Sequence, residues 1–110
     1  MVKIIVLWTR PEDPDAFEEY YVSRYLPVAR PVPNVRLVEL STVVGSPRGG
    51  ESRYHRVGEI WFGTQEDAQA ALDSPEGKAW MAELEVLGEG RVEVIMTDTE
   101  WLPEDKSEQP

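Results

Sequence analysis

The chain has 110 residues, which is the length of one domain. With 41% hydrophobic and 29% charged residues, it has the composition of a folded globular protein and not of a disordered one. The formal net charge of −10 argues against a nucleic acid or an anionic membrane as partner. The absence of cysteine excludes disulfides, zinc–thiolate sites and thiol nucleophiles.

The first residues, MVKIIVLWTRPEDPD, contain an apolar run that breaks at Thr9 and Arg10. This run is too short to span a membrane and lacks a small-residue cleavage site. We therefore expect a soluble, cytoplasmic protein.

Residues 2–9 (VKIIVLWT) predict a strand, because they are rich in β-branched residues and end at the turn sequence RPEDP. Apart from Lys3 and Thr9 the run is apolar on both sides, which is typical of a strand covered on both faces.

A helix is predicted to follow, with Asp13 as its N-cap and Pro14 at its first position. Four residues at helical spacing form one apolar stripe: Phe17, Tyr21, Tyr25 and Val28. Pro27 is expected to kink or tighten the last turn, before the sequence RPVPN ends the helix.

Two further strands are predicted at residues 35–44 and 54–62, joined as a hairpin by the loop GSPRGGESR. Gly58 lies inside the second of them and indicates either a β-bulge or a close approach of the backbone.

The second half begins with a helix over residues 64–73, capped by Thr64. Ser74, Pro75 and Glu76 predict its continuation or a third short helix, which ends at Gly88 and Gly90. Residues 91–99 predict the last strand. Residues 102–110 are expected to form a disordered acidic tail, because PEDKSEQP has no apolar residue.

The order of elements predicts an α+β fold of the ferredoxin-like βαββαβ type over residues 1–101: a four-stranded antiparallel sheet with helices on one face. The apolar first strand then needs a cover on the other face. A second copy of the sheet is the simplest cover, which predicts a homodimer of the dimeric α/β-barrel type.

Charge is unevenly distributed along the sequence. Residues 22–57 hold six arginines against two glutamates, whereas both flanking segments are acidic. This positive segment has two interpretations: it holds an anionic ligand, or its arginines solvate a helix end and a hairpin.

The ordered motifs resemble those of the EthD family of dimeric α/β-barrel proteins. The matching stretches are VKIIVLWTRPEDPDAFEEYY, SRYLPVARPVPNVR, YHRVGEIWFGTQEDAQAALDSPEGKAW and VEVIMTDT, of which GEIWFGTQEDAQAALDSPEGKAW is the most specific. That family usually has a histidine two residues before the proline of the first helix, where this chain has Tyr25. The resemblance implies a place in oxidative degradation. It also implies kinship with small barrels that oxygenate, cyclise or isomerise hydrophobic ring compounds, often without a cofactor.

Three residues are candidates for catalysis. Tyr25 can donate a hydrogen bond but is a poor base at neutral pH. His55 is the single histidine. Strand alternation predicts that it shares a face with Glu59, about 13 Å along the strand, too far for direct contact unless Gly58 forms a bulge. Glu59, on a central strand, should meet a cation across the dimer or have a raised pKa.

Trp8 and Trp61 are candidate flat walls for a ring-shaped ligand, and Tyr21 is expected to line a cavity with Tyr25 at its lip, between the first helix and the sheet. Core packing is the alternative for each. No cofactor motif is present, and we expect no cofactor. One histidine without cysteine argues against a transition-metal site, while an all-oxygen cation site in the acidic half stays an alternative.

Two functions follow. The first is a cofactor-independent enzyme, or an oxygenase accessory protein, acting on a small hydrophobic or aromatic compound, with Tyr25 as donor, His55 as base and Glu59 orienting one of them. The second is a non-catalytic metabolite-binding protein. A dimeric domain without a ligand is a third possibility.

Overall fold

The computed structural model describes residues 1–100. In chain order the elements are β1 (Val2–Thr9), α1 (Pro14–Tyr20), the π-helical turn η1 (Tyr21–Tyr25), α2 (Leu26–Ala29), β2 (Val35–Thr42), β3 (Tyr54–Phe62), α3 (Gln65–Asp73), α4 (Pro75–Gly88) and β4 (Val92–Asp98). The predicted tail, residues 102–110, and the predicted domain end at residue 101 lie outside the described residues. Among residues 1–100 no helix is long and apolar enough to cross a bilayer.

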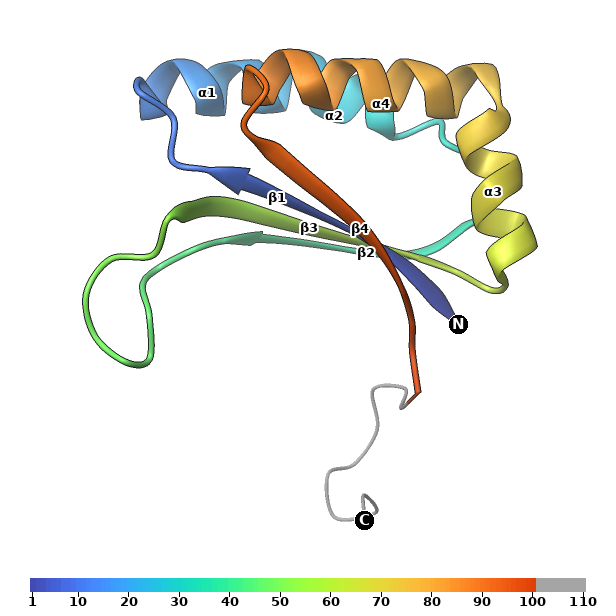
Figure 1. Ribbon diagram of the computed structural model, residues 1–110. Helices are drawn as coiled ribbons and strands as arrows, with labels where there is room; N and C mark the ends of the chain where they lie inside the picture. The colour runs from blue at the N-terminus through green and yellow to red at the C-terminus, as the bar shows by residue number, and fades with distance from the viewer. Residues whose placement is uncertain (101–110) are drawn as a thin grey trace.

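The four strands form one sheet in the order β2-β3-β1-β4, and each neighbouring pair is antiparallel. The helices lie on one side of this sheet, as Figure 1 shows. The predicted ferredoxin-like α+β fold is therefore confirmed. The hairpin strand β2 ends two residues earlier than predicted, at Thr42, whereas β3 has the predicted bounds.

Strand β1 carries the centre of the core. Its even-numbered residues, from Val2 to Trp8, are buried under the helices, and its odd-numbered residues are only half-buried on the other face. The second face thus presents Ile5 and Leu7 without a covering layer from residues 1–100. The apolar residues on both faces of β1 therefore have different surroundings: one face packs under the helices and the other is half-buried.

The first helical segment begins where the sequence predicts, because the Asp13 carboxylate accepts a hydrogen bond from the Ala16 amide at 3.1 Å. It contains a π-helical turn, closed by the Leu26 amide donating to the Tyr21 carbonyl. Pro27 follows this turn. Since proline has no amide hydrogen and its ring collides with the carbonyl four residues earlier, we attribute the wider turn to Pro27. The turn is therefore opened and not tightened.

The second helical segment is two helices separated by a sharp corner. Thr64 caps α3 through the Asp67 amide, and Ser74 caps α4 through the Gly77 amide. A Cβ atom at Gly77 would lie 1.8 Å from the Ala71 carbonyl oxygen, so only glycine fits at this corner.

Strand β3 has a register shift against β1 where Trp8 pairs with Arg56 and Thr9 pairs with Tyr54. The extra residue is His55. The expected bulge at Gly58 is wrong, because pairing continues through that position and a Cβ there would find no atom closer than 3.7 Å. The irregularity lies three residues earlier and turns His55 toward the helices.

Candidate functional site

A cavity of about 300 Å³ opens between the helical side of the sheet and the segment η1–α2. Its lining is Tyr25, Leu26, Ala29, Arg30, Val32, Val35, Val38, Leu40, Ile60 and Trp80. Eight of these ten side chains are apolar or tryptophan, which suits a small hydrophobic molecule. The π turn helps to form the cavity, because it presents Tyr25 and Leu26 to it from adjacent positions.

The hydroxyl of Tyr25 is the buried polar group of this cavity. Its oxygen accepts a hydrogen bond from Trp80 Nε1 at 2.9 Å, and the residue is 3% exposed. Burial raises the pKa of Tyr25 above its ordinary value. The hydroxyl therefore stays protonated, and among residues 1–100 its hydrogen has no hydrogen-bond acceptor. It is available to a ligand.

An aromatic row continues from Tyr25 along the helix. Tyr21 stacks on Tyr25 with ring centroids 5.3 Å apart, and Phe17 stacks on Tyr21 at 6.2 Å. The edge of this row meets Trp8, whose ring is nearly perpendicular to all three. Trp8 and Tyr21 thus pack in the core, and neither lines the cavity of Tyr25.

His55 lies at the other end of the row. Its ring packs edge-on against Phe17 at 5.0 Å, and its Nε2 lies 2.9 Å from Glu18 Oε2. Arg56 donates two hydrogen bonds to the same carboxylate, from Nε at 3.0 Å and from Nη2 at 2.6 Å. These bonds from Arg56, assisted by His55, lower the pKa of the Glu18 carboxyl.

The predicted face of His55 is therefore wrong, because the bulge places it under α1 while Glu59 remains on the opposite face. Glu59 accepts a hydrogen bond from Lys3 at 2.9 Å, so a cation of its own chain pairs with it. The Lys3 ammonium also lies 4.7 Å from the Trp61 ring centroid. Trp61 and Trp8 consequently face opposite sides of the sheet and cannot enclose one ligand.

Of the residues proposed from the sequence, Tyr25 alone lines the cavity. Trp80 was missed, because its spacing with Leu84 and Leu87 reads as an ordinary core stripe of a helix. The sequence analysis also did not identify Val38 and Leu40 of β2 as lining residues. Strand alternation predicts which face of the sheet they occupy, but it does not show that the helices leave them half-exposed there. No signal in the sequence pairs Trp80 with Tyr25, 55 residues away.

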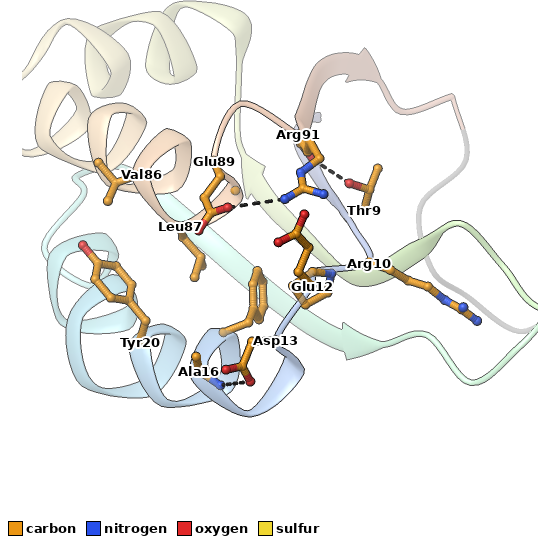
Figure 2. A pocket seen from close by; sticks show the side chains of 13 residues that line it. Thr9, Arg10, Glu12, Asp13, Ala16, Tyr20, Val86, Leu87, Glu89 and Arg91 are labelled. Carbon is orange, nitrogen blue, oxygen red and sulfur yellow. Dashed lines mark hydrogen bonds and ion pairs between the residues drawn. The ribbon is translucent and has the colours of Figure 1, made fainter.

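A second hollow, of about 370 Å³, lies between the start of α1 and the end of α4 (Figure 2). Several of its polar groups already have partners: Glu89 pairs with Arg91 and Asp13 caps α1. Figure 2 shows Arg10 pointing away from the hollow, and its guanidinium pairs with Glu51 at 2.7 Å. Within residues 1–100, no group of three acidic or histidine side chains that could hold a metal ion was found.

A sequence profile of the EthD domain matches residues 9–87. The chain belongs to the EthD family. An uncharacterized 11.0 kDa protein of Rhodococcus erythropolis, encoded in the thcB-thcC intergenic region, is 27% identical over 100 residues, which are 91% of this chain and 96% of that protein.

The fold is shared with solved structures of this family and beyond it. An ethyl tert-butyl ether D (EthD) family protein of Bacillus halodurans has 31% identity and a TM-score of 0.85, covering 90% of this chain and 98% of that one. A cofactor-independent oxygenase of Streptomyces nogalater has 18% identity and a TM-score of 0.64, covering 94% and 97%. At that identity the likeness concerns the fold alone.

Proposed function

We propose that this EthD-family chain binds a small hydrophobic or aromatic compound in the cavity beside Tyr25, without a bound cofactor. The observation that carries the proposal is an apolar cavity with one buried hydroxyl whose hydrogen has no acceptor within residues 1–100. A ligand with an apolar body and one oxygen or nitrogen acceptor satisfies both the surface and the hydroxyl.

Tyr25 acts in this proposal as a hydrogen-bond donor and not as a base. The Trp80 bond occupies its oxygen from one side, and burial raises its pKa, so loss of its proton at neutral pH is unfavourable. His55 does not line the cavity, which separates it from the role of base that the sequence suggested.

Non-catalytic binding, including service as an oxygenase accessory protein, is the function that this lining supports best. Among residues 1–100 no carboxylate or imidazole belongs to the lining, so this part of the chain offers the cavity no side-chain base for general acid–base chemistry. The second candidate is cofactor-independent conversion of the bound compound, in oxidative degradation or a related pathway of the cytoplasm. The fold is compatible with it, since a cofactor-independent oxygenase of Streptomyces nogalater has the same fold.

The homodimer is also a proposal. The face of the sheet away from the helices carries Ile5, Leu7, Leu37 and Ile95, and Leu37 and Ile95 are 45% and 49% exposed. Lys3, Glu39, Glu59 and Glu93 lie on the same face. Its exposed apolar residues, with no helix over them, are suited to pair with a second copy across a two-fold axis.

Mass spectrometry of the denatured protein after purification tests the function. We expect a small hydrophobic compound to co-purify with the wild type, and to be reduced in Tyr25→Phe, which removes one hydroxyl and keeps the ring. Incubation of that complex in air then separates the two candidates: an unchanged compound indicates binding, and a modified one indicates conversion. Equal retention of the compound by Tyr25→Phe would contradict the role of Tyr25.

A further inference from the structure

The charged and polar side chains of the cavity are all hydrogen-bond donors. Tyr25 offers its hydroxyl hydrogen, Arg30 offers its guanidinium, and Trp80 already donates to Tyr25. Tyr25 is 3% exposed and Arg30 is exposed, so the hydroxyl is the deep donor and the guanidinium lies near the mouth. A ligand that fits this set has acceptor atoms only.

Arg30 is an arginine of this cavity without an ion pair. Arg53 pairs with Glu93 and Arg56 with Glu18, both at 2.6 Å, whereas Arg24, Arg30, Arg36 and Arg48 make no ion pair within residues 1–100. Of these four arginines, Arg30 is the one that lines the cavity. Arg30 is the C-cap of α2, where a positive charge interacts favourably with the carbonyl end of the helix. Its guanidinium can still bind an anion.

The positive segment of the sequence forms most of this cavity. Eight of the ten lining residues fall between residues 22 and 57, the one stretch in which arginines outnumber acids. The protein as a whole carries a net charge of −10 and repels anions, so an anionic ligand needs this local excess of positive charge.

We propose that the ligand is an amphiphilic carboxylate: an apolar ring or short chain that lies against Val38, Leu40 and Ile60, with its carboxylate at the mouth on Arg30. Tyr25 donates to an oxygen on the buried part. This inference rests on the proposed function, because it names the ligand class of the same cavity. It assigns Arg30 as the residue that selects anions over their neutral analogues.

Matched pairs of probes test the inference by isothermal titration calorimetry: 4-methoxybenzoate and 6-methoxy-2-naphthoate, each against its methyl ester. The methoxy oxygen gives the Tyr25 hydroxyl an acceptor on the apolar part of each probe. We expect at least one carboxylate to bind the wild type roughly tenfold or more tightly than its ester, the range for a hydrogen bond to a charged group. Arg30→Gln should weaken binding of the carboxylate much more than binding of its ester, and so abolish the preference. Arg24→Gln is the matched control, because it removes the same charge from the same helical segment outside the cavity.

A variant with a filled cavity distinguishes failure of the proposed function from failure of the proposed anion selection. Val38→Trp enlarges a half-exposed residue of an edge strand, where it blocks the cavity with little effect on the core. If the esters bind as tightly as the carboxylates and Val38→Trp abolishes binding of both, the proposed function stands and the selection of anions is wrong. If no probe binds, or binding survives Val38→Trp, both are wrong. A preference that persists in Arg30→Gln overturns the role of Arg30.

Discussion

The indole nitrogen of Trp80, on α4, donates a hydrogen bond to the hydroxyl of Tyr25, on η1, across 2.9 Å in the buried interior. This bond joins the two helical segments behind the cavity and fixes the direction of the tyrosine hydroxyl. Trp80 occupies one acceptor site of the Tyr25 oxygen, which leaves the hydroxyl hydrogen free to donate to the proposed ligand. The bond therefore affects both the stability of the fold, by linking α4 to η1, and the cavity, by orienting the Tyr25 hydroxyl.

Tyr25→Phe should lower the free energy of unfolding by about 1–2 kcal/mol, because it leaves the buried indole N–H of Trp80 without an acceptor. Urea denaturation followed by circular dichroism measures this change. Trp80→Phe breaks the same bond from the other side, and the double variant should cost less than the sum of the two single ones. Strict additivity would contradict a direct bond between the two side chains.

Tyr25→His places at this position the histidine that the family resemblance implies there. Burial disfavours a charged imidazole, so the folded protein should lower the pKa of this histidine below its unfolded value of roughly 6.5. The unfolded chain then binds more protons as the pH falls, and the variant should lose stability relative to the wild type between about pH 7 and pH 5. Wild type contains His55, so the difference between the two proteins is the quantity to measure. A constant difference across this range would contradict the burial of position 25.

Much of the fold follows from local sequence signals. Asp13, Thr64 and Ser74 each cap the helix that the sequence predicts for them, and the alternation of β1 follows directly from its residue pattern. These signals depend on residues close together in the chain, where spacing alone fixes the geometry.

The features that the sequence did not reveal depend on register or on contacts between distant segments. One extra residue at His55 moves its side chain to the other face, and neither composition nor periodicity locates such a bulge in a strand of β-forming residues. Likewise, Glu59 finds Lys3 only after β1 and β3 pair in a particular register. The cavity combines residues from Tyr25 to Trp80, so its outline exists only in three dimensions.

Glu18→Gln should lower stability at neutral pH by roughly 1 kcal/mol, since it removes a half-exposed carboxylate that Arg56 holds by two bonds. The folded state lowers the pKa of Glu18 from its ordinary value of 4.5. Its contribution is therefore complete above about pH 4.5 and is lost as the pH falls through the lower folded value. The deficit of the variant should shrink accordingly in acid.

Thermal unfolding from pH 7 to pH 3 measures this convergence. Glu19→Gln is the control, because Glu19 lies on the same helix, is exposed, and makes no ion pair within residues 1–100. A deficit of Glu18→Gln that stays constant into acid would mean that the carboxylate charge is not what stabilises the fold.

Gly77→Ala should be strongly destabilising, by about 2–3 kcal/mol or more, because its methyl group would collide with the Ala71 carbonyl at the corner between α3 and α4. Gly58→Ala is the matched comparison and should change stability much less, since a Cβ there makes only ordinary contacts with Leu40 and Ile60. Chemical denaturation of both variants measures the difference. Equal effects would contradict the packing of the α3–α4 corner.

The exposed apolar residues on the face of the sheet away from the helices predict a homodimer. Light scattering at micromolar concentration should give twice the chain mass of 12.5 kDa. Ile95→Lys, on the face without helices, should shift the protein toward the monomer, because it buries a charge in the proposed interface. Val22→Lys places the same charge on an exposed helical position and should leave the dimer intact. A wild-type monomer would contradict the proposed pairing of sheets.

A two-dimensional NMR titration of the ¹⁵N-labelled protein with 6-methoxy-2-naphthoate tests whether a ligand binds in the cavity beside Tyr25. The four tryptophans give four indole N–H signals, and one of them belongs to the Tyr25-bound Trp80. We expect saturable shifts at the Trp80 indole and at the amides of Leu26, Ala29, Val38 and Leu40, with those of the hollow in Figure 2 unchanged. Shifts confined to that hollow, or no saturable shift at the Trp80 indole, would contradict ligand binding in the cavity beside Tyr25.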